Sequence, residues 1–248
     1  MKILKLIRLI VLRNIREEKF LTFLSIIGIA LGIGLFVGVK VASDRAIAFF
    51  ESDVRGIEPA TNYEIFDVSG IDFDERVYRD TRSIVDENFP VVKTFGHIPA
   101  LGETIDLNGI YTVKALDILD FAGPGSADFE SFYRTVNGVL ITSEFSEKHG
   151  VKKGDTLTPI VYDREYPLKV VDIVAGKRLP KNMVVMDIGN YQEYFGKAGG
   201  VTRIDLIADD AAADSLRRAL PTNLRIERVE QIVKNRKGLV ASFRYNLQ

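Results

Sequence analysis

The stretch Phe20–Val39, with the sequence FLTFLSIIGIALGIGLFVGV, contains no charged residue and no proline. An α-helix rises about 1.5 Å per residue and the hydrocarbon core of a bilayer is about 30 Å thick, so roughly 20 apolar residues are enough to cross it. Lys19 precedes the stretch and Lys40 follows it. The sequence therefore predicts a transmembrane helix over residues 20–41, which divides the rest of the chain between the two sides of a membrane.

The charges on the two sides of the predicted span have opposite signs. Residues 1–19 carry six basic and two acidic side chains, a net charge of +4; because the whole chain sums to −1, residues 20–248 sum to −5. An excess of lysine and arginine beside a span marks its cytoplasmic side. We therefore expect a cytoplasmic amino terminus, with residues 42–248 mostly periplasmic or extracellular.

Residues 1–19 also have a pattern of their own. Most of their basic residues are spaced by three, with Ile, Leu and Val between them, which favours an amphipathic helix on the cytoplasmic membrane surface. The alternative is a plain positive flank of the span. Cleavage of residues 1–43 as a signal peptide is disfavoured, because the apolar stretch is about twice as long as the usual h-region of roughly 7–15 residues.

Four glycines form two small-xxx-small pairs inside the span: Gly28 with Gly32, and Gly34 with Gly38. Small residues four positions apart let helix backbones approach closely in a membrane. The pairs therefore predict that this helix packs against other transmembrane helices, in the same chain or in a partner. The alternative is that glycine is simply frequent in membrane helices.

Beyond Lys40 the helical pattern continues without a breaker as far as Gly56, which predicts a helical stalk within residues 42–60. The region after it alternates strand and helix patterns, which predicts an α+β external domain. Strands are expected at residues 61–68, 91–97, 139–142, 156–162, 166–175, 183–186, 202–208 and 224–228. Helices are expected at residues 74–88, 128–134, 144–149, 187–195 and 211–220, with Asp187 opening the helix that runs to Phe195.

The pair Asn108-Gly109 is the strongest local turn signal in the external region. It lies between strand-like runs at residues 103–107 and 110–116. Because this pair readily adopts the positive φ angles of a two-residue turn, it predicts a β-hairpin.

Helix 144–149 has signals at both ends, with Ser143 as the expected N-cap and Gly150 as the expected stop. A further turn is expected at residues 163–165. Residues 229–248 form a helical pattern that becomes more apolar toward its end and has no stop signal. This predicts a returning stalk that leads to a second span beyond the sequence, which would make the chain a fragment.

Two segments carry a family resemblance. Val139–Ala175, VLITSEFSEKHGVKKGDTLTPIVYDREYPLKVVDIVA, resembles a segment of the MacB/FtsX/LolC-type ABC transporter permeases, including Gly154-Asp155-Thr156 at a turn. Met183–Phe195, MVVMDIGNYQEYF, is similar to the segment that follows it in that family, and Leu239–Gln248 to the start of the family's second span. The resemblance covers nearly the whole chain, but its motifs are degenerate hydrophobic patterns without a catalytic signature.

The resemblance implies a two-part external domain of α+β class. Residues 61–135 and 200–228 would form a porter-like βαβ subdomain, and residues 136–199 an inserted, mainly β, Sabre-like subdomain. Residues 229–248 would be the returning stalk.

The resemblance also implies a function: a permease subunit of an ABC transporter in the bacterial inner membrane. Its expected partners are a separate ABC ATPase subunit, a second permease copy, membrane lipid, and a periplasmic adaptor, lipoprotein or hydrolase. Its cargo would be a lipoprotein, lipid, peptide or hydrophobic drug. An FtsX-like regulator of an extracytoplasmic cell-wall hydrolase is the alternative.

The residues themselves offer little chemistry. The chain has no cysteine and only two histidines, His97 and His149, for which structural or surface roles are favoured. No zinc-type spacing or Walker A sequence occurs, so ATP hydrolysis is expected on another chain. No catalytic, cofactor or metal site is predicted, and no basic stripe indicates nucleic acid. A single-span anchored enzyme or sensor is therefore disfavoured.

Two charged loops have weaker alternatives. The acidic residues Asp67, Asp72, Asp74 and Glu75 could hold a cation, but they lack EF-hand spacing and a solvated loop is favoured. The basic turn of Lys177, Arg178 and Lys181 could bind an acidic partner, but here too a solvated loop is favoured.

Overall fold

The computed structural model describes residues 19–54, 61–112, 129–174, 181–235 and 238, with only the backbone for residues 43–54. The chain separates into two units. One contains residues 1–51 and 239–248, and the other is an external domain of residues 52–238.

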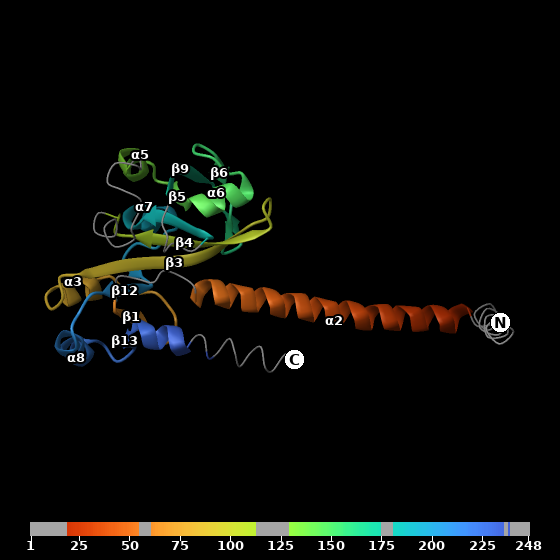
Figure 1. Cartoon of the computed structure of the whole chain (residues 1–248), viewed down its shortest axis with the longest axis horizontal. Coiled ribbons are helices and arrows are strands. Elements are labelled where there is room, and N and C mark those ends of the chain that lie inside the picture. The colour runs from red at the N-terminus through yellow and green to blue at the C-terminus, as the bar shows by residue number, and fades with distance from the viewer. Residues whose placement is uncertain (1–18, 55–60, 113–128, 175–180, 236–237, 239–248) are drawn as a thin grey trace. The chain divides into compact units, whose positions relative to one another are not determined.

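Helix α2 (Lys19–Val54) runs without interruption from the predicted span into the predicted stalk (Figure 1). Its segment Lys19–Ala42 has a mean hydropathy of 2.5 with no residue buried, and is long and apolar enough to cross a membrane. The Ser25 hydroxyl in this segment donates a hydrogen bond to the Leu21 carbonyl at 2.9 Å, so this polar group is satisfied within the helix. The expected surface helix of residues 1–19 lies almost entirely outside the described residues.

The external domain is built on one mixed sheet of 11 strands and a two-stranded ribbon. The main strands are β1 (Tyr63–Asp67), β3 (Asn88–Ile98), β4 (Glu103–Ile110), β5 (Gly138–Thr142), β9 (Leu168–Val174), β10 (Met183–Asp187), β12 (Arg203–Leu206) and β13 (Leu224–Arg228). The short ones are β2 (Phe73–Asp74), β6 (Thr156–Leu157), β7 (Ile160–Val161), β8 (Arg164–Glu165) and β11 (Gly200–Val201).

The principal path of the sheet runs β13-β1-β12-β3-β4-β10-β5-β9-β6. We call β13, β1, β12 and β3 the first half, and β4, β10, β5, β9 and β6 the second half. Most pairs are antiparallel; β4 with β10 and β5 with β9 are parallel. The halves meet where the 11-residue strand β3 pairs with β4 along eight positions, from Val91–Ile110 to Ile98–Glu103.

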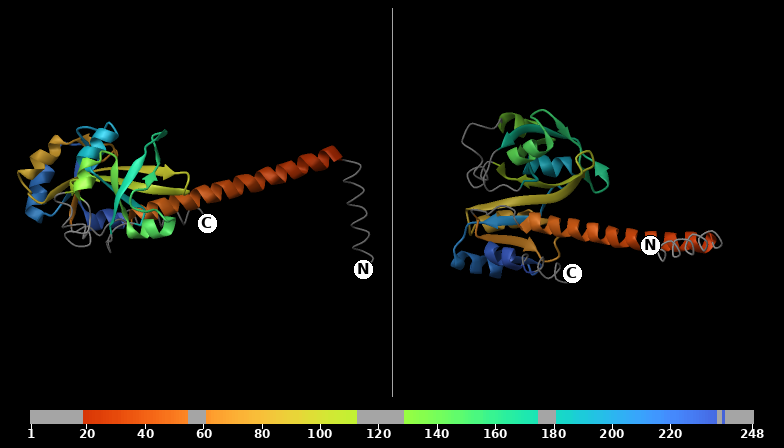
Figure 2. Two further views of the ribbon diagram at one scale, coloured as in Figure 1. Left: turned by 90° about the horizontal axis from the view of Figure 1, so that it is seen from above. Right: turned by 45° about the vertical axis from the view of Figure 1, so that its right-hand side comes forward.

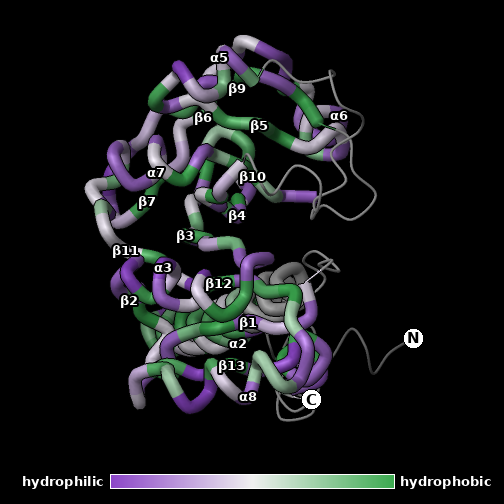
Figure 3. The backbone as a smooth tube through the Cα atoms, turned by 90° about the vertical axis from the view of Figure 1, so that its left-hand side faces the viewer, coloured by the Kyte–Doolittle hydropathy of each residue, from purple (hydrophilic) through white to green (hydrophobic). Residues whose placement is uncertain are grey.

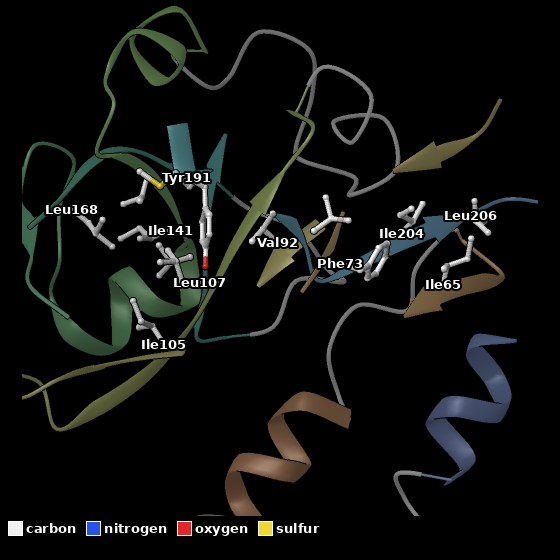
Figure 4. Close-up of a cluster of buried hydrophobic side chains, with 14 of the residues drawn as sticks. Ile65, Phe73, Val92, Ile105, Leu107, Ile141, Leu168, Tyr191, Ile204 and Leu206 are labelled. Atoms are coloured by element: carbon white, nitrogen blue, oxygen red, sulfur yellow. The ribbon is translucent and has the colours of Figure 1, made fainter. Parts of the chain in front are cut away.

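Helices cover both faces of the sheet. They are α3 (Arg76–Arg82), α5 (Phe129–Arg134), α6 (Ser143–His149), α7 (Ile188–Tyr194) and α8 (Asp210–Ala219). Side chains from α3, α6, α7 and α8 join one continuous core that runs through both halves, from Ile65 to Leu168 (Figure 4). Phe132 of α5 anchors a smaller cluster of second-half residues with Val91 and Ile110. The hydropathy pattern follows this arrangement, with apolar strands inside and polar loops outside (Figure 3).

The predicted α+β class, with an apolar N-terminal helix and a sheet-rich domain, is confirmed. Most predicted elements are present to within a few residues. The predicted subdomain boundaries, at residues 135/136 and 199/200, stay a prediction. One sheet and one core pass through both predicted parts, because β4 and β10 pair directly.

The predicted hairpin around Asn108-Gly109 is wrong. Both residues lie inside β4, and the turn instead spans residues 99–102, where Gly102 has a φ of 60°. Gly109 has a packing role, because an added Cβ would lie 2.7 Å from Cβ of Tyr191. Asn108 is buried, and its side-chain amide donates to Asp106 Oδ1 at 2.9 Å.

Three local predictions differ in detail from the structure. The N-cap of α6 is Thr142, whose hydroxyl accepts from Phe145 N at 3.2 Å, and not Ser143. The next turn is Tyr162-Asp163, both with positive φ, one position before the predicted 163–165. The predicted strand 156–162 is split into β6 and β7.

Two other signals hold. Gly150 ends α6 in the left-handed conformation, with a φ of 68°. Asp187 caps α7 by accepting from the backbone N–H groups of Gly189 and Asn190. Both are local signals that depend on a few neighbouring residues. Residues 229–235 are helical as predicted, and the end of the predicted returning stalk lies outside the described residues.

Candidate functional site

The external domain begins and ends at neighbouring backbone positions. β1 and β13 pair antiparallel, and one step beyond the pair Val229 N donates to Asn62 O at 3.1 Å. Val229 starts the helix of residues 229–235, which we call the exit helix. The first residue of the exit helix is therefore hydrogen-bonded to Asn62, which precedes the first strand of the sheet. β13 ends at Arg228, so it leads directly into the exit helix; Figure 2 shows the sheet and its helices in two further views.

Asn62 ties this point to a third segment. Its side chain donates to Ala208 O at 2.7 Å and accepts from Ala208 N at 3.0 Å. Its backbone N–H donates to Leu206 O at 2.9 Å. Through one residue, the start of β1, the end of β12 and the root of the exit helix are fixed together.

A polar cluster stands beside Asn62. The Tyr63 hydroxyl donates to Asp210 Oδ1 at 2.5 Å, and Arg228 donates to the same oxygen. The Arg228 guanidinium lies 5.1 Å from the centre of the Tyr63 ring, in cation–π geometry. The bond to the Asp210 carboxylate, together with burial, raises the pKa of the Tyr63 phenol. We call Asn62, Tyr63, Asp210, Arg228 and Val229 the stalk junction.

An open groove of about 830 Å³ lies next to the junction, along β13. It is bounded by the end of α8, the loop after it, β13 and the start of the exit helix. Its charged lining consists of Arg217, Arg218, Arg225, Arg228 and Glu227. We call it the β13 groove. Four cations against one anion give it a basic character.

Buried charges connect the two halves of the sheet. Lys93 on β3 lies 3.0 Å from Asp106 on β4, with side chains 14% and 11% exposed. Nearby, Arg203 lies 2.9 Å from Asp205 on β12. Burial lowers the pKa of the Arg203 guanidinium, but the Asp205 and Glu64 carboxylates outweigh this and raise it above its usual value. The Lys93–Asp106 pair links β3 to β4, whereas the Arg203–Asp205 pair lies within β12.

The carboxylates of the predicted acidic patch accept hydrogen bonds from neighbouring residues of the domain. Asp72 accepts from Thr202 at 2.7 Å and from Lys197 at 3.0 Å, and this bond raises the pKa of the Lys197 ammonium. Asp67 accepts from Ser69 and from Asn223, which lowers the pKa of its carboxyl group.

The rest of the patch has similar partners: Asp74 accepts from Arg76 N, and Glu75 from Gln192. Among the described residues, no group of three or more His, Asp or Glu side chains could hold a metal ion.

The two histidines occupy structural positions. His97 is exposed on β3, with its Nδ1 3.5 Å from the Thr104 hydroxyl. The His149 ring packs against Phe145 at 4.7 Å between centroids, and its Nε2 lies 3.3 Å from the Glu103 carboxylate.

Of the predicted basic turn, Lys181 is ion-paired with Glu144 at 3.6 Å. Lys177 and Arg178 lie outside the described residues.

The four span glycines lie on two faces of α2. Gly28 and Gly32 share one face and Gly34 and Gly38 another, about 120° apart at 100° per residue. Within the described structure, no atom lies within 4 Å of the position that a Cβ would take at any of them. Their predicted role in helix packing stays a prediction.

No protein-family model matches the chain. The chain is 26% identical over 247 residues to the uncharacterized ABC transporter permease protein Rv0987 of Mycobacterium tuberculosis. The match covers 95% of the chain but only 28% of the relative's length.

Solved structures give the fold. The crystal structure of the periplasmic region of MacB from Actinobacillus actinomycetemcomitans matches with a TM-score of 0.51 at 14% identity, over 73% of this chain and 94% of that one. The external domain has the MacB periplasmic fold. The extracellular domain of the noncanonic ABC-type transporter YknZ from Gram-positive bacteria gives a TM-score of 0.47 at 14% identity, over 67% of this chain and all of that one. The permease relative and the MacB fold together confirm the predicted resemblance to MacB-type ABC transporter permeases.

In this MacB-type domain, the sequence pattern indicated neither the stalk junction nor the β13 groove. Asn62 has no local signal of its role, because its partner Ala208 lies 146 residues away in the chain. The arginines of the groove are spread over α8 and β13, and only the tertiary structure brings them together. The one available hint is the Arg-rich run at residues 217–228.

Proposed function

We propose that this chain is part of the permease subunit of an ABC transporter of the MacB/LolC type, located in a bacterial inner membrane with its amino terminus in the cytoplasm. In this proposal the external domain binds cargo or a partner and is coupled mechanically to ATP hydrolysis on a separate ATPase subunit. The permease relative, the MacB fold and the apolar helix α2 support it. The domain itself would catalyse nothing.

The stalk junction is the observation that carries the mechanical part. α2 is continuous from its apolar segment to Val54, and the exit helix begins at Val229, which is bonded to Asn62. In this proposal a movement of one helix relative to the other would apply a force to the sheet edge formed by β12, β1 and β13. Transmission of this kind requires two states of an element that both ends can bias. In this proposal the β12-β1-β13 edge is the element that both helices bias, and the strand pairing and the Val229–Asn62 bond support it.

The pairing of β3 with β4 would carry a movement of the first half of the sheet into the second half. β3 and β4 share eight paired positions and the buried Lys93–Asp106 ion pair. A displacement at β1 and β12 would thus be carried into β4 and the second half as a rigid movement. Cargo or a periplasmic adaptor bound to the second half would respond to the cytoplasmic cycle.

The membrane partners follow from the span. Two glycine faces about 120° apart suit two different helix neighbours. In this proposal the faces of Gly28 with Gly32 and of Gly34 with Gly38 pack against other transmembrane helices, in the same chain or in a second permease copy. Membrane lipid would cover the rest of the helix. The cargo class remains lipoprotein, lipid, peptide or hydrophobic drug.

The test uses the complete permease copurified with its ATPase in lipid nanodiscs. Asn62→Ala removes the tie to Ala208, and Asn137→Ala, which loses an exposed bond to Pro167 O far from the junction, is the matched control. We expect lipoprotein-stimulated or lipid-stimulated ATPase activity to fall several-fold in Asn62→Ala, with basal activity unchanged. Asn137→Ala should behave like the wild type.

Three outcomes would contradict the proposal. Equal stimulation in both variants would remove the junction from the mechanism. Stimulation by a cell-wall hydrolase but by no cargo would favour the FtsX-like regulator. ATPase activity that never depends on this subunit would exclude both functions.

A further inference from the structure

Among the described strands, β13 is the last of the sheet and pairs only with β1. Val229 N donates to Asn62 O at 3.1 Å. At the other end of the pair, Val68 N donates to Asn223 O at 3.0 Å. Because hydrogen-bonded and non-bonded positions alternate in an antiparallel pair, Ile226 at the centre of β13 directs its N–H and C=O away from β1. This edge offers backbone groups to another strand.

The β13 groove runs along that same edge. Arg225 and Arg228 come from the strand itself, on opposite faces of the sheet: Arg225 lies opposite Phe66 and Arg228 opposite Tyr63. Arg217 and Arg218 come from the last turn of α8. All four arginines are exposed. A strand placed here would meet an arginine on each of its faces.

The four arginines differ in whether they form ion pairs with carboxylates. Arg217 is paired with Asp214, and Arg228 with Asp210. Arg218 donates to the Ser215 hydroxyl at 3.3 Å. Within the described part of the chain, neither Arg218 nor Arg225 forms an ion pair with a carboxylate. An incoming carboxylate would find unpaired cations on both sides of the edge.

We infer that the β13 groove binds an extended, acidic segment of a partner protein by strand addition to β13. Main-chain hydrogen bonds to a free sheet edge provide the pairing. Opposite charges on neighbouring strands stabilise it and select acidic sequences. The groove volume of about 830 Å³ leaves room for the side chains of such a strand.

A second copy of this chain fits the groove poorly. Pairing of two β13 edges about a two-fold axis would bring the same four arginines of both copies together. Charged residues on an edge strand disfavour such self-pairing. The charge therefore selects an acidic partner, and the inference does not depend on whether the chain transports cargo.

The test titrates the full chain, in nonionic detergent at low ionic strength, against a labelled ten-residue peptide of alternating threonine and glutamate. Fluorescence anisotropy reports binding. We expect saturable binding by the glutamate peptide and none by a threonine–lysine peptide. N-methylation of every peptide bond in the glutamate peptide, which removes its main-chain donors, should abolish binding.

Two double variants separate the groove from general electrostatics. Arg218→Glu with Arg225→Glu should weaken binding about tenfold, from two exposed charge reversals. Arg79→Glu with Arg164→Glu changes the net charge equally at exposed sites outside the groove and should leave binding unchanged. Near-ultraviolet circular dichroism checks that both variants are folded.

Four results would overturn the inference. These are no saturable binding of the glutamate peptide, equal weakening in both double variants, full binding of the N-methylated peptide, and self-association of the chain that changes only in the groove variant. The last would make a second copy the occupant of the edge.

Discussion

The span of α2 and the external domain are built from the same residue types but bury them in different ways. In the span the side chain of Leu35 is 72% exposed, whereas Leu107 and Ile141 in the sheet are fully buried. The domain supplies its own apolar surroundings. The span must receive them from lipid or from other helices, because its surface is apolar on every side.

Glycine shows the same difference at single-residue scale. At Gly28 and Gly32, no described atom lies within 4 Å of an added Cβ. At Gly109 and Gly96, added Cβ atoms would lie 2.7 Å from Tyr191 and 2.8 Å from Pro159. In the sheet, glycine makes room for a neighbour within the chain. In the span, we expect it to make room for a neighbour from elsewhere.

The largest effect is expected from Gly109→Val. Its side chain would overlap Tyr191 in the core, and overpacking of this kind costs about 3 kcal/mol. The melting temperature of the external domain should fall by on the order of 10 °C. Near-ultraviolet circular dichroism of the tyrosines follows mainly this domain, because eight of the nine lie within it and none lies in α2. Gly28→Ala is the control, and an equal fall in both variants would contradict the comparison.

A smaller loss of stability is expected from Asn62→Ala. It removes two side-chain hydrogen bonds to Ala208, each worth about 1 kcal/mol, with water replacing part of the loss at this exposed site. The free energy of unfolding of the external domain should fall by about 1–2 kcal/mol in urea titrations. An unchanged value would mean that Asn62 does not hold the stalk junction together.

In the span we expect the opposite pattern: a substitution should weaken association of the permease without changing the stability of the external domain. Replacing Gly28 and Gly32 together by leucine should weaken association of the permease about tenfold, since helix contacts of this type are worth about 1–2 kcal/mol. Cross-linking in membranes measures the association. The melting temperature of the external domain should not change. Unaffected association would make α2 a simple anchor.

The smallest effect is expected from pH. The bonds from Ser69 and Asn223 lower the pKa of Asp67, so the ionised carboxylate stabilises the folded state above about pH 4, the ordinary value of an unfolded Asp. This contribution is lost as pH falls through the lower, folded pKa. The difference in melting temperature between wild type and Asp67→Asn should therefore shrink below pH 4. A constant difference would contradict this assignment.

The features that could be predicted from the amino-acid sequence are those that depend on neighbouring residues. The apolar helix, the continuous stalk, the caps at Gly150 and Asp187 and most strand positions are of this kind, because hydropathy and capping act within a few residues. The MacB-type resemblance also followed from such local hydrophobic patterns.

The contacts between distant segments could not be predicted from the sequence and emerge from the packed fold. Asn108-Gly109 has the composition of a turn, yet the core places it within β4, where Tyr191 needs the space that Gly109 leaves. Asn62 and Ala208 come together through the pairing of β1 with β12, and the arginines of the β13 groove through the packing of α8 against β13. Contacts between residues far apart in the chain depend on the whole packed fold, and no local pattern encodes them.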